Sequence, residues 1–269
     1  MVAAAYSSGT PALGVGAGNC VTTVCESADL DESADKIVLS KTLDLAASCS
    51  SDNAVILFDS IHDAMLAKLQ ERGGYVLNDA EKAQLQAVLW TDGHINPKIV
   101  AQPAEVIAAE AGFAEALPEG TRFFIVPEVG FGSAYPFSGE KMSVTMTLYR
   151  APDIDTAIEL TNGIQAYQGM GHSCGIYSTN DEHIMKLAHA TKTSRLLVNQ
   201  PQAASNSGNL WNGLRQTFSL GCGSWGKTSI CENINWEHLI NVTWVSKNLA
   251  TPKELRPDDV LFARIKGRF

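Results

Sequence analysis

The chain has 269 residues, of which 45% are hydrophobic and 18% charged, so it can bury a sizeable core in one large domain or two small ones. Its formal net charge is −9 and its Lys and Arg residues are scattered, which argues against nucleic acid as a partner. No apolar run approaches the roughly 20 residues of a membrane span and the first residues lack a signal-peptide pattern, so we expect a cytoplasmic protein without a membrane partner.

Segments of helical and strand character alternate along the chain, which predicts an α/β fold with an open twisted sheet flanked by helices. Apolar periodicity predicts helices at 1–8, 29–45, 60–72, 79–89, 103–111, 154–167 and 182–192. Apolar runs predict strands at 12–15, 21–24, 53–58, 123–126, 143–149, 174–177, 195–199 and 241–245. We expect the strand at 195–199 to be central in the sheet.

The cysteines and histidines show no recognisable metal-binding spacing. The six cysteines include no CxxC pair, and the six histidines form no HExxH motif. Cys20 and Cys25 could form half of a zinc site, but no second pair with ligand spacing follows them. We therefore expect free thiols in a reducing compartment and no metal.

A glycine cluster near the beginning of the chain has two possible interpretations. Gly14, Gly16 and Gly18 have the spacing GxGxG, whereas a dinucleotide-binding loop has GxGxxG. The β-like residues at 21–24 follow, so no helix amino terminus is positioned for a pyrophosphate. A turn in which the backbone closely approaches its neighbours is the favoured interpretation.

Cys49 lies at 46–52, in a loop of small and polar residues between a predicted helix and a predicted buried strand. Small neighbours leave room for a substrate carbonyl to reach the sulfur, and adjacent backbone N–H groups could stabilise an oxyanion. A buried structural cysteine explains the same pattern about as well. The residues alone leave both interpretations open.

Two further positions combine titratable groups with unusual neighbours. His172 follows Gly169 and Gly171, which remove bulk from around the imidazole, and this setting fits a site residue and a structural histidine about equally. Glu140 and Lys141 precede the predicted strand at 143–149. Charged pairs at such positions are usually solvated, so composition alone assigns Glu140 no role.

Short motifs spread over nearly the whole chain resemble the CoA-dependent acylating branch of the aldehyde dehydrogenase superfamily. They are YSSGTP at 6–11, GVGAGN at 14–19, EKM at 140–142, GHS at 171–173 and LGCGSWG at 220–226. They occur in the family's order, and the set is far more specific than any single motif. The resemblance implies an aldehyde-dehydrogenase-like catalytic domain that converts an aldehyde and CoA to an acyl-CoA.

The resemblance also implies roles for three residues. The family's catalytic cysteine lies between a helix and a strand, about thirty residues beyond the glycine-rich segment, and Cys49 is the only cysteine here in that position. Its thiolate would attack the aldehyde, the thiohemiacetal would pass hydride to NAD or NADP, and the thioester would be transferred to CoA. Glu140 matches a glutamate that binds the nicotinamide ribose, and His172 matches a histidine near the substrate and CoA channel.

The match to the family has consequences for the organisation of the chain. Family members have a long segment before this point that holds most of the cofactor domain, so the resemblance implies an amino-terminally truncated chain. We expect residues 1–18 to be a remnant of the cofactor-binding domain, 19–239 the catalytic domain, and 240–269 an oligomerisation tail of a homo-oligomer.

Two alternative functions remain open. They are a catalytically silent fragment that acts as a folded or subunit-binding module, and a hydrolytic aldehyde dehydrogenase. The hydrolytic alternative is disfavoured because such relatives carry Glu in place of Gly14.

Residues 200–225 are rich in Gly, Ser and Asn and lack periodicity, which is typical of a segment that builds a site. In the family this region lies close to the catalytic cysteine, and here it carries Arg215. If Arg215 faces the pocket, the preferred aldehyde carries a terminal anion, as sulfoacetaldehyde and succinate semialdehyde do. Sulfoacetaldehyde is the first choice, because the segment is most similar to that subgroup. A surface ion pair of Arg215 with an acidic residue is the alternative.

Overall fold

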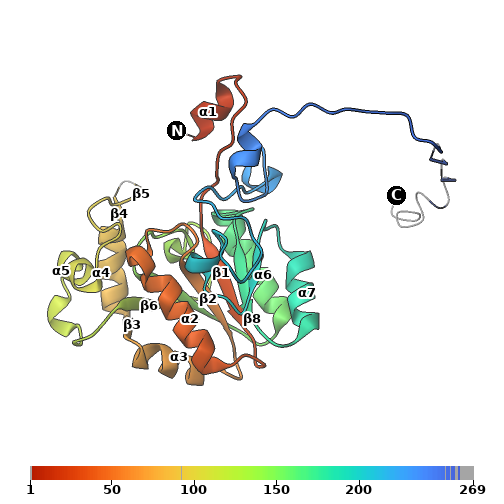
Figure 1. Cartoon of the computed structure of the whole chain (residues 1–269). Helices are drawn as coiled ribbons and strands as arrows, with labels where there is room; N and C mark the ends of the chain where they lie inside the picture. Colours follow the sequence, from red (N-terminus) through yellow and green to blue (C-terminus); the bar gives the residue numbers. More distant parts are fainter. Residues whose placement is uncertain (1, 92, 252, 255, 258–259, 261–269) are drawn as a thin grey trace. The chain divides into compact units, whose positions relative to one another are not determined.

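The computed structural model describes residues 2–91, 93–251, 253–254, 256–257 and 260 (Figure 1). Internal contacts divide the chain into two units, Met1–Asn235 and Trp236–Phe269. The first unit contains a seven-stranded sheet in the order β3-β6-β7-β2-β1-β8-β9, in which all neighbouring strands are parallel. The predicted α/β class is therefore confirmed.

The elements of the described residues have the following bounds. The strands of the main sheet are β1 (Cys20–Val24), β2 (Asp52–Phe58), β3 (Gly74–Val76), β6 (Phe123–Pro127), β7 (Thr145–Ala151), β8 (Cys174–Tyr177) and β9 (Leu196–Val198), and a separate antiparallel hairpin pairs β4 (Trp90–Thr91) with β5 (His94–Ile95). The helices are α1 (Val2–Ser7), α2 (Leu30–Thr42), α3 (His62–Glu71), α4 (Asp79–Leu89), α5 (Ala104–Ala111), α6 (Ile154–Tyr167), α7 (Asp181–Ala190) and α8 (Gln202–Ser205). Short 3₁₀ helices are η1 (Leu43–Ala46), η2 (Ala114–Ala116), η3 (Pro136–Ser138), η4 (Ser224–Gly226) and η5 (Trp236–Leu239).

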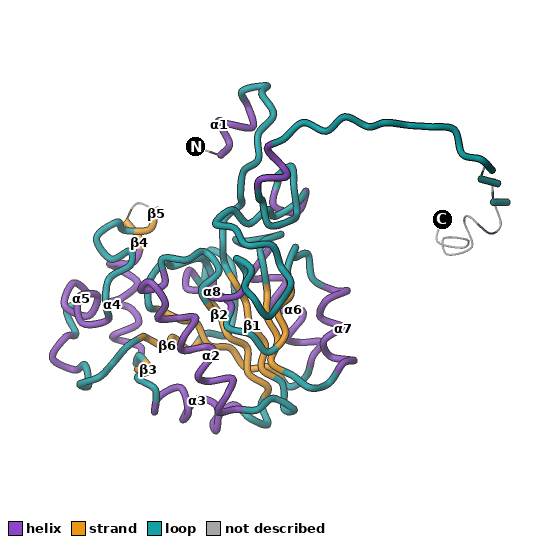
Figure 2. Tube along the Cα trace, in the orientation of Figure 1, coloured by secondary structure: helices purple, strands orange, loops and turns teal. Residues whose placement is uncertain are grey.

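Strand β2 shows how the sheet is buried on both faces. Successive side chains of a strand point to opposite faces, so Val55 and Leu57 join one apolar cluster while Ala54 and Ile56 join the other. Helices α2, α3, α4 and α5 contribute to the first cluster, and α6 and α7 to the second. Figure 2 shows the strands of the main sheet side by side with helices around them, and the β4–β5 hairpin apart from this sheet. A run without polar residues, such as 54–58, follows from this double coverage.

Three strand predictions are wrong in part or whole. Residues 12–15 form no strand, and the chain runs there as a loop. Strand β9 stands at one end of the strand order, so it is an edge strand rather than a central one. Residues 241–245 have no regular structure, because an apolar run becomes a strand only where a partner supplies hydrogen bonds.

Short elements that pair across the fold were not predicted. Strand β3 begins at Gly74, where the double glycine predicts only a turn, and it exists because it pairs with β6. A Cβ on Gly74 would lie 2.8 Å from the Leu69 carbonyl oxygen and from side-chain atoms of β6, so the glycine permits this close packing. The hairpin of β4 and β5 has only two residues in each strand, which is too few for periodicity to be read.

The second unit, Trp236–Phe269, has little regular structure among its described residues. After η5, residues 241–249 have no regular structure, and the Trp244 and Val245 side chains are 90% and 81% exposed. Much of the predicted oligomerisation tail, including 261–269, lies outside the described residues, as does Met1 of the predicted first helix. None of the described helices is long and apolar enough to cross a bilayer.

Candidate active site

Cys49 lies in the turn that connects η1 to β2. Before it, Asp44, Leu45 and Ala46 have φ angles of 47°, 51° and 61°, a left-handed run that non-glycine residues rarely adopt. This run ends the helical path of α2 and directs the chain into a turn that the Ser51 amide closes by donating to the Ser48 carbonyl at 3.0 Å. Cys49 itself is partly buried. Backbone strain next to a thiol is a frequent feature of functional sites.

His172 lies directly beside this thiol. Its Nε2 is 3.2 Å from Cys49 Sγ, although the two residues are 123 positions apart. The ring is fully buried, and its Nδ1 lies 2.8 Å from Ser173 Oγ. In the tautomer in which Nδ1 donates to Ser173, Nε2 can accept the thiol proton. His172 precedes β8 and Cys49 precedes β2, so both lie at the amino-terminal edge of the parallel sheet.

The electrostatics of this pair favour two neutral groups. Burial raises the pKa of the Cys49 thiol to about 11, helped by the charges of Glu140 and Cys222 and opposed by Arg195. Burial, together with the charge of Arg195, lowers the pKa of His172 to about 3. Near pH 7 the resting site is therefore a thiol and a neutral imidazole, rather than a thiolate–imidazolium pair. Such an imidazole is unprotonated and can accept a proton, although its lowered pKa makes it a weak base in the resting site.

Glu140 lies on the other side of Cys49, across Gly18. A Cβ on Gly18 would lie 2.2 Å from the Cys49 carbonyl oxygen and 2.6 Å from Glu140 Oε1. The close-approach interpretation of the glycine cluster is therefore confirmed at Gly18. Burial raises the pKa of the Glu140 carboxyl, while the nearby cations of Lys141 and Lys41 lower it.

Two buried asparagines hold the three loops of this site together. Asn19 Nδ2 donates to the carbonyl oxygens of Ser138 and Gln168, at 2.8 and 3.1 Å. Asn53 Nδ2 donates to Asn19 Oδ1 and, at 2.7 Å, to the carbonyl oxygen of Gly139. These bonds fix the segment before Glu140 and the segment before His172 against β1 and β2.

Arg215 lies apart from Cys49, in a neighbouring cavity of about 280 Å³ that is lined by residues of 194–195, 213–215 and 231–233. Its guanidinium is 3.9 Å from Glu232, and both side chains are about half exposed, so the surface ion pair that the sequence left open is formed. The deeper cation of the cavity is Arg195, which donates to the His172 carbonyl oxygen at 2.7 Å. The Nε of Arg195 is buried without a hydrogen-bond partner among the described residues.

The structure thus brings Cys49, His172 and Glu140 together, whereas Arg215 lies in the neighbouring cavity. Sequence reasoning missed Arg195 and the asparagine pair. The only signal for Arg195 was an arginine at the first position of the predicted strand 195–199, where a charge is usually solvated. Burial of its side chain, to 5% exposure, comes from segments distant in the sequence.

Comparison with known proteins shows relatives over nearly the whole chain, although no family model matches it. The sulfoacetaldehyde dehydrogenase (acylating) of Cupriavidus necator is 40% identical over 97% of this chain and 53% of its own length. The sulfoacetaldehyde dehydrogenase of an Acholeplasma species is 42% identical over 96% of this chain and 53% of its own length. A succinate-semialdehyde dehydrogenase (acetylating) of Clostridium kluyveri is 38% identical over 90% and 53%. The chain therefore spans about half the length of the curated relatives it matches.

Solved structures agree with these relatives. A probable aldehyde dehydrogenase from Listeria monocytogenes superposes with a TM-score of 0.88 at 35% identity, over 96% of this chain and 56% of that one. An engineered glycolyl-CoA reductase with bound NADP+ has a TM-score of 0.73 at 25% identity, over 84% and 50%. A propionaldehyde dehydrogenase from Rhodopseudomonas palustris with bound propionyl-CoA has the same TM-score and identity, over 86% and 50%. In sequence and in fold, the chain is similar to about half of an acylating aldehyde dehydrogenase.

Proposed function

We propose that this chain carries the acyl-transfer centre of an enzyme that oxidises an aldehyde to its acyl-CoA, with Cys49 as the nucleophile and His172 as its base. The observation that carries the proposal is the 3.2 Å distance between Cys49 Sγ and His172 Nε2, in a buried site where both groups are neutral. Only a neutral imidazole can take the thiol proton at the moment of attack. A silent fragment has no need of this arrangement.

The first step of the proposed reaction moves the thiol proton of Cys49 and develops negative charge on the substrate's carbonyl oxygen. As sulfur attacks the carbonyl carbon, the thiol proton moves to Nε2 of His172 and negative charge develops on the carbonyl oxygen. The backbone of Cys49 interacts with its own sulfur and lowers the thiol pKa, and we propose that its N–H donates to that oxygen during the attack. A bound nicotinamide cofactor supplies the hydride acceptor that converts the thiohemiacetal to a thioester. As CoA takes the acyl group, the imidazolium returns its proton to the Cys49 sulfur, and the proton of the CoA thiol is released to solvent.

Glu140 is proposed to hold the ribose of NAD or NADP next to the catalytic sulfur. Its carboxylate lies across Gly18 from Cys49, and carboxylate oxygens accept hydrogen bonds from ribose hydroxyls. The relatives with bound NADP+ and propionyl-CoA support a nicotinamide cofactor and CoA as the co-substrates. All six cysteines are free, which fits a cytoplasmic enzyme.

We further propose the domain organisation that the sequence predicts, with residues 1–18 belonging to the cofactor-binding part and 240–269 to a homo-oligomer contact. The exposed apolar side chains of Trp244 and Val245 support a contact there.

The proposed substrate is an aldehyde with a terminal anion, such as sulfoacetaldehyde or succinate semialdehyde. The cavity beside His172 contains two arginines and one glutamate, so its side chains carry a net positive charge. The relatives named for sulfoacetaldehyde and succinate semialdehyde support the same class. Arg195 is proposed to bind the anion at depth, with Arg215 at the rim.

The decisive experiment uses the half of the reaction that needs no nicotinamide. The full chain is incubated with succinyl-CoA, and its intact mass and the release of CoA are followed over time. We expect one succinyl group per chain, on Cys49, together with one CoA released. A chain that never gains the acyl mass, although it is folded by circular dichroism, would establish the silent-fragment alternative.

Adding a methyl group at Gly18 should impair this transfer. In Gly18→Ala the new Cβ overlaps the Cys49 carbonyl, so the catalytic loop must shift by about 1 Å, which costs about a hundredfold in rate. The acylation rate is the measurement, and thermal unfolding shows whether the variant is folded. An acylation rate equal to that of the parent chain would contradict the close approach of these loops.

Replacing Arg215 should affect anionic acyl groups selectively. Arg215→Ala is expected to slow acylation by succinyl-CoA about tenfold, the lower end for a charge-assisted contact, because the side chain is partly solvated. Acylation by neutral propionyl-CoA should change little. Equal losses with both donors would show that Arg215 supports the fold or the CoA site, and the anionic-substrate proposal would then rest on Arg195 alone.

A further inference from the structure

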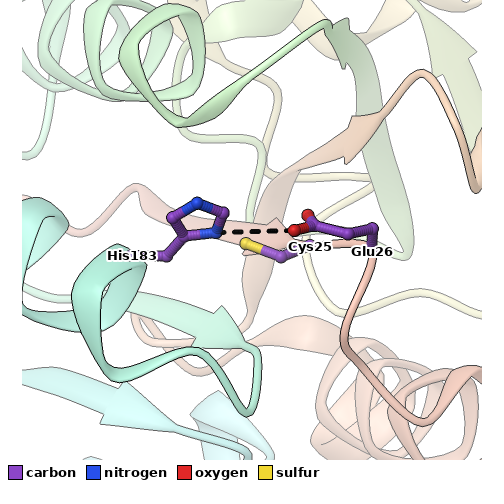
Figure 3. A group of neighbouring side chains, drawn as sticks. All are labelled: Cys25, Glu26 and His183. Atoms are coloured by element: carbon purple, nitrogen blue, oxygen red, sulfur yellow. Dashed lines mark ion pairs between the residues drawn. The ribbon is translucent and has the colours of Figure 1, made fainter.

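A second group of reactive side chains lies at the opposite edge of the sheet from Cys49. Cys25 and Glu26 directly follow the carboxyl end of β1, and His183 lies in the first turn of α7 (Figure 3). One donor atom from each residue lies within 4.8 Å of the other two. His183 Nδ1 and Glu26 Oε1 are 3.9 Å apart, which is too far for a hydrogen bond.

One ligand atom of this cluster has no other partner among the residues that the structure describes. Nδ1 of His183 is buried and has no hydrogen-bond partner in the described part of the chain. The Cys25 side chain is fully buried, while Glu26 is about half exposed and connects the cluster to solvent. The ring of Phe58, 5.8 Å from the His183 ring, packs against one side. A buried ring nitrogen without a partner costs free energy, so it needs an explanation.

We propose that Cys25, Glu26 and His183 bind a divalent zinc-type cation. A thiolate, a carboxylate and a neutral imidazole carry two negative charges together, so they balance the ion in a buried place. Sulfur and imidazole nitrogen are the donors that zinc prefers over magnesium or calcium. On binding, the ion replaces the thiol proton of Cys25, which is released to solvent.

The geometry requires only a small closure. Zinc–nitrogen and zinc–oxygen bonds of about 2.1 Å at a tetrahedral angle put the two ligand atoms about 3.4 Å apart. The present 3.9 Å between His183 Nδ1 and Glu26 Oε1 would shorten to this value, and the distances from Cys25 Sγ, now at most 4.8 Å, would shorten to about 3.6 Å. Glu26, which is half-exposed, is the ligand with room to move. The fourth position faces the solvent side of Glu26 and would hold water. The bound ion would tie the end of β1 to α7 and so stabilise that side of the sheet.

The test uses Co²⁺ as a probe, because a cobalt–thiolate bond gives a charge-transfer band in the near ultraviolet. The full chain, stripped with chelator and reduced, is titrated with Co²⁺. We expect one equivalent to give the band in the parent chain and none in Cys25→Ser. Zn²⁺ should displace the cobalt and raise the melting temperature of the parent chain but not of Cys25→Ser.

Matched variants separate this cluster from the catalytic pair, which also combines a thiol and an imidazole. Cys49→Ser and Cys231→Ser should keep the band. Glu26→Gln, a change at a half-exposed position that leaves folding intact, should weaken Co²⁺ binding about tenfold or more. The proposal is overturned if the parent chain shows no saturable band, if the band survives Cys25→Ser, or if it is lost in Cys49→Ser. None of these readouts depends on acyl transfer.

Discussion

Cys49→Ser should reduce acylation of the chain by succinyl-CoA by at least about a thousandfold. A serine hydroxyl in the same place is a far weaker nucleophile than a thiol, and His172 near 3.2 Å cannot compensate for this. The measurement is the rate at which the succinyl mass appears on the intact chain. The partly buried position of Cys49 and its neighbour contacts should accept serine without loss of the fold.

The control is Cys231→Ser, which removes the exposed cysteine. Because Cys231 also lines the cavity proposed for the anion, the control uses neutral propionyl-CoA, and its acylation rate should be unchanged. Because Cys231 is the more accessible thiol, a small amount of non-specific acylation can occur there. Retention of rapid, single-site acylation in Cys49→Ser, or its loss in Cys231→Ser, would assign the nucleophile to another cysteine.

His172→Gln should lower the acylation rate about 10²- to 10⁴-fold at pH 7, the usual range for loss of a general base. Glutamine retains a polar group of similar size but cannot take the thiol proton. The rate of this variant should then rise about tenfold per pH unit as the thiolate fraction grows, up to the Cys49 pKa of about 11. His172 is not among the causes of that raised pKa, so the substitution should leave it in place.

The parent chain should behave differently across the same range. Its His172 has a pKa lowered to about 3, so the base is neutral, and competent, from weakly acidic to alkaline pH. The rate should therefore be nearly flat where that of His172→Gln climbs. His189→Gln, at an exposed position of α7, is the matched control and should follow the parent. Parallel pH profiles for the parent and His172→Gln would show that His172 only positions the thiol.

Some features of this protein were determined by local sequence. Helices α4 and α6 and strand β8 have the predicted bounds, because capping residues and apolar periodicity act over a few neighbours. Asn78 and Glu81 form a complete capping box at the start of α4, and Asp153 caps α6. The small residues of the Cys49 loop and the order of the family motifs likewise make this thiol the predicted nucleophile on the basis of sequence alone.

Other features were decided only by tertiary structure, because they depend on contacts between distant segments. The residues of β3 form a strand because they pair with β6. Strand β9 is an edge strand because it lies beyond β8 at the end of the strand order. Burial, not composition, raises the pKa of Cys49 and lowers that of His172, which makes the pair neutral. The spacing of cysteines and histidines in the sequence predicts no metal site, since Cys25 and His183 are 158 positions apart. Folding alone brings these two side chains together. Folding likewise brings His172 to Cys49.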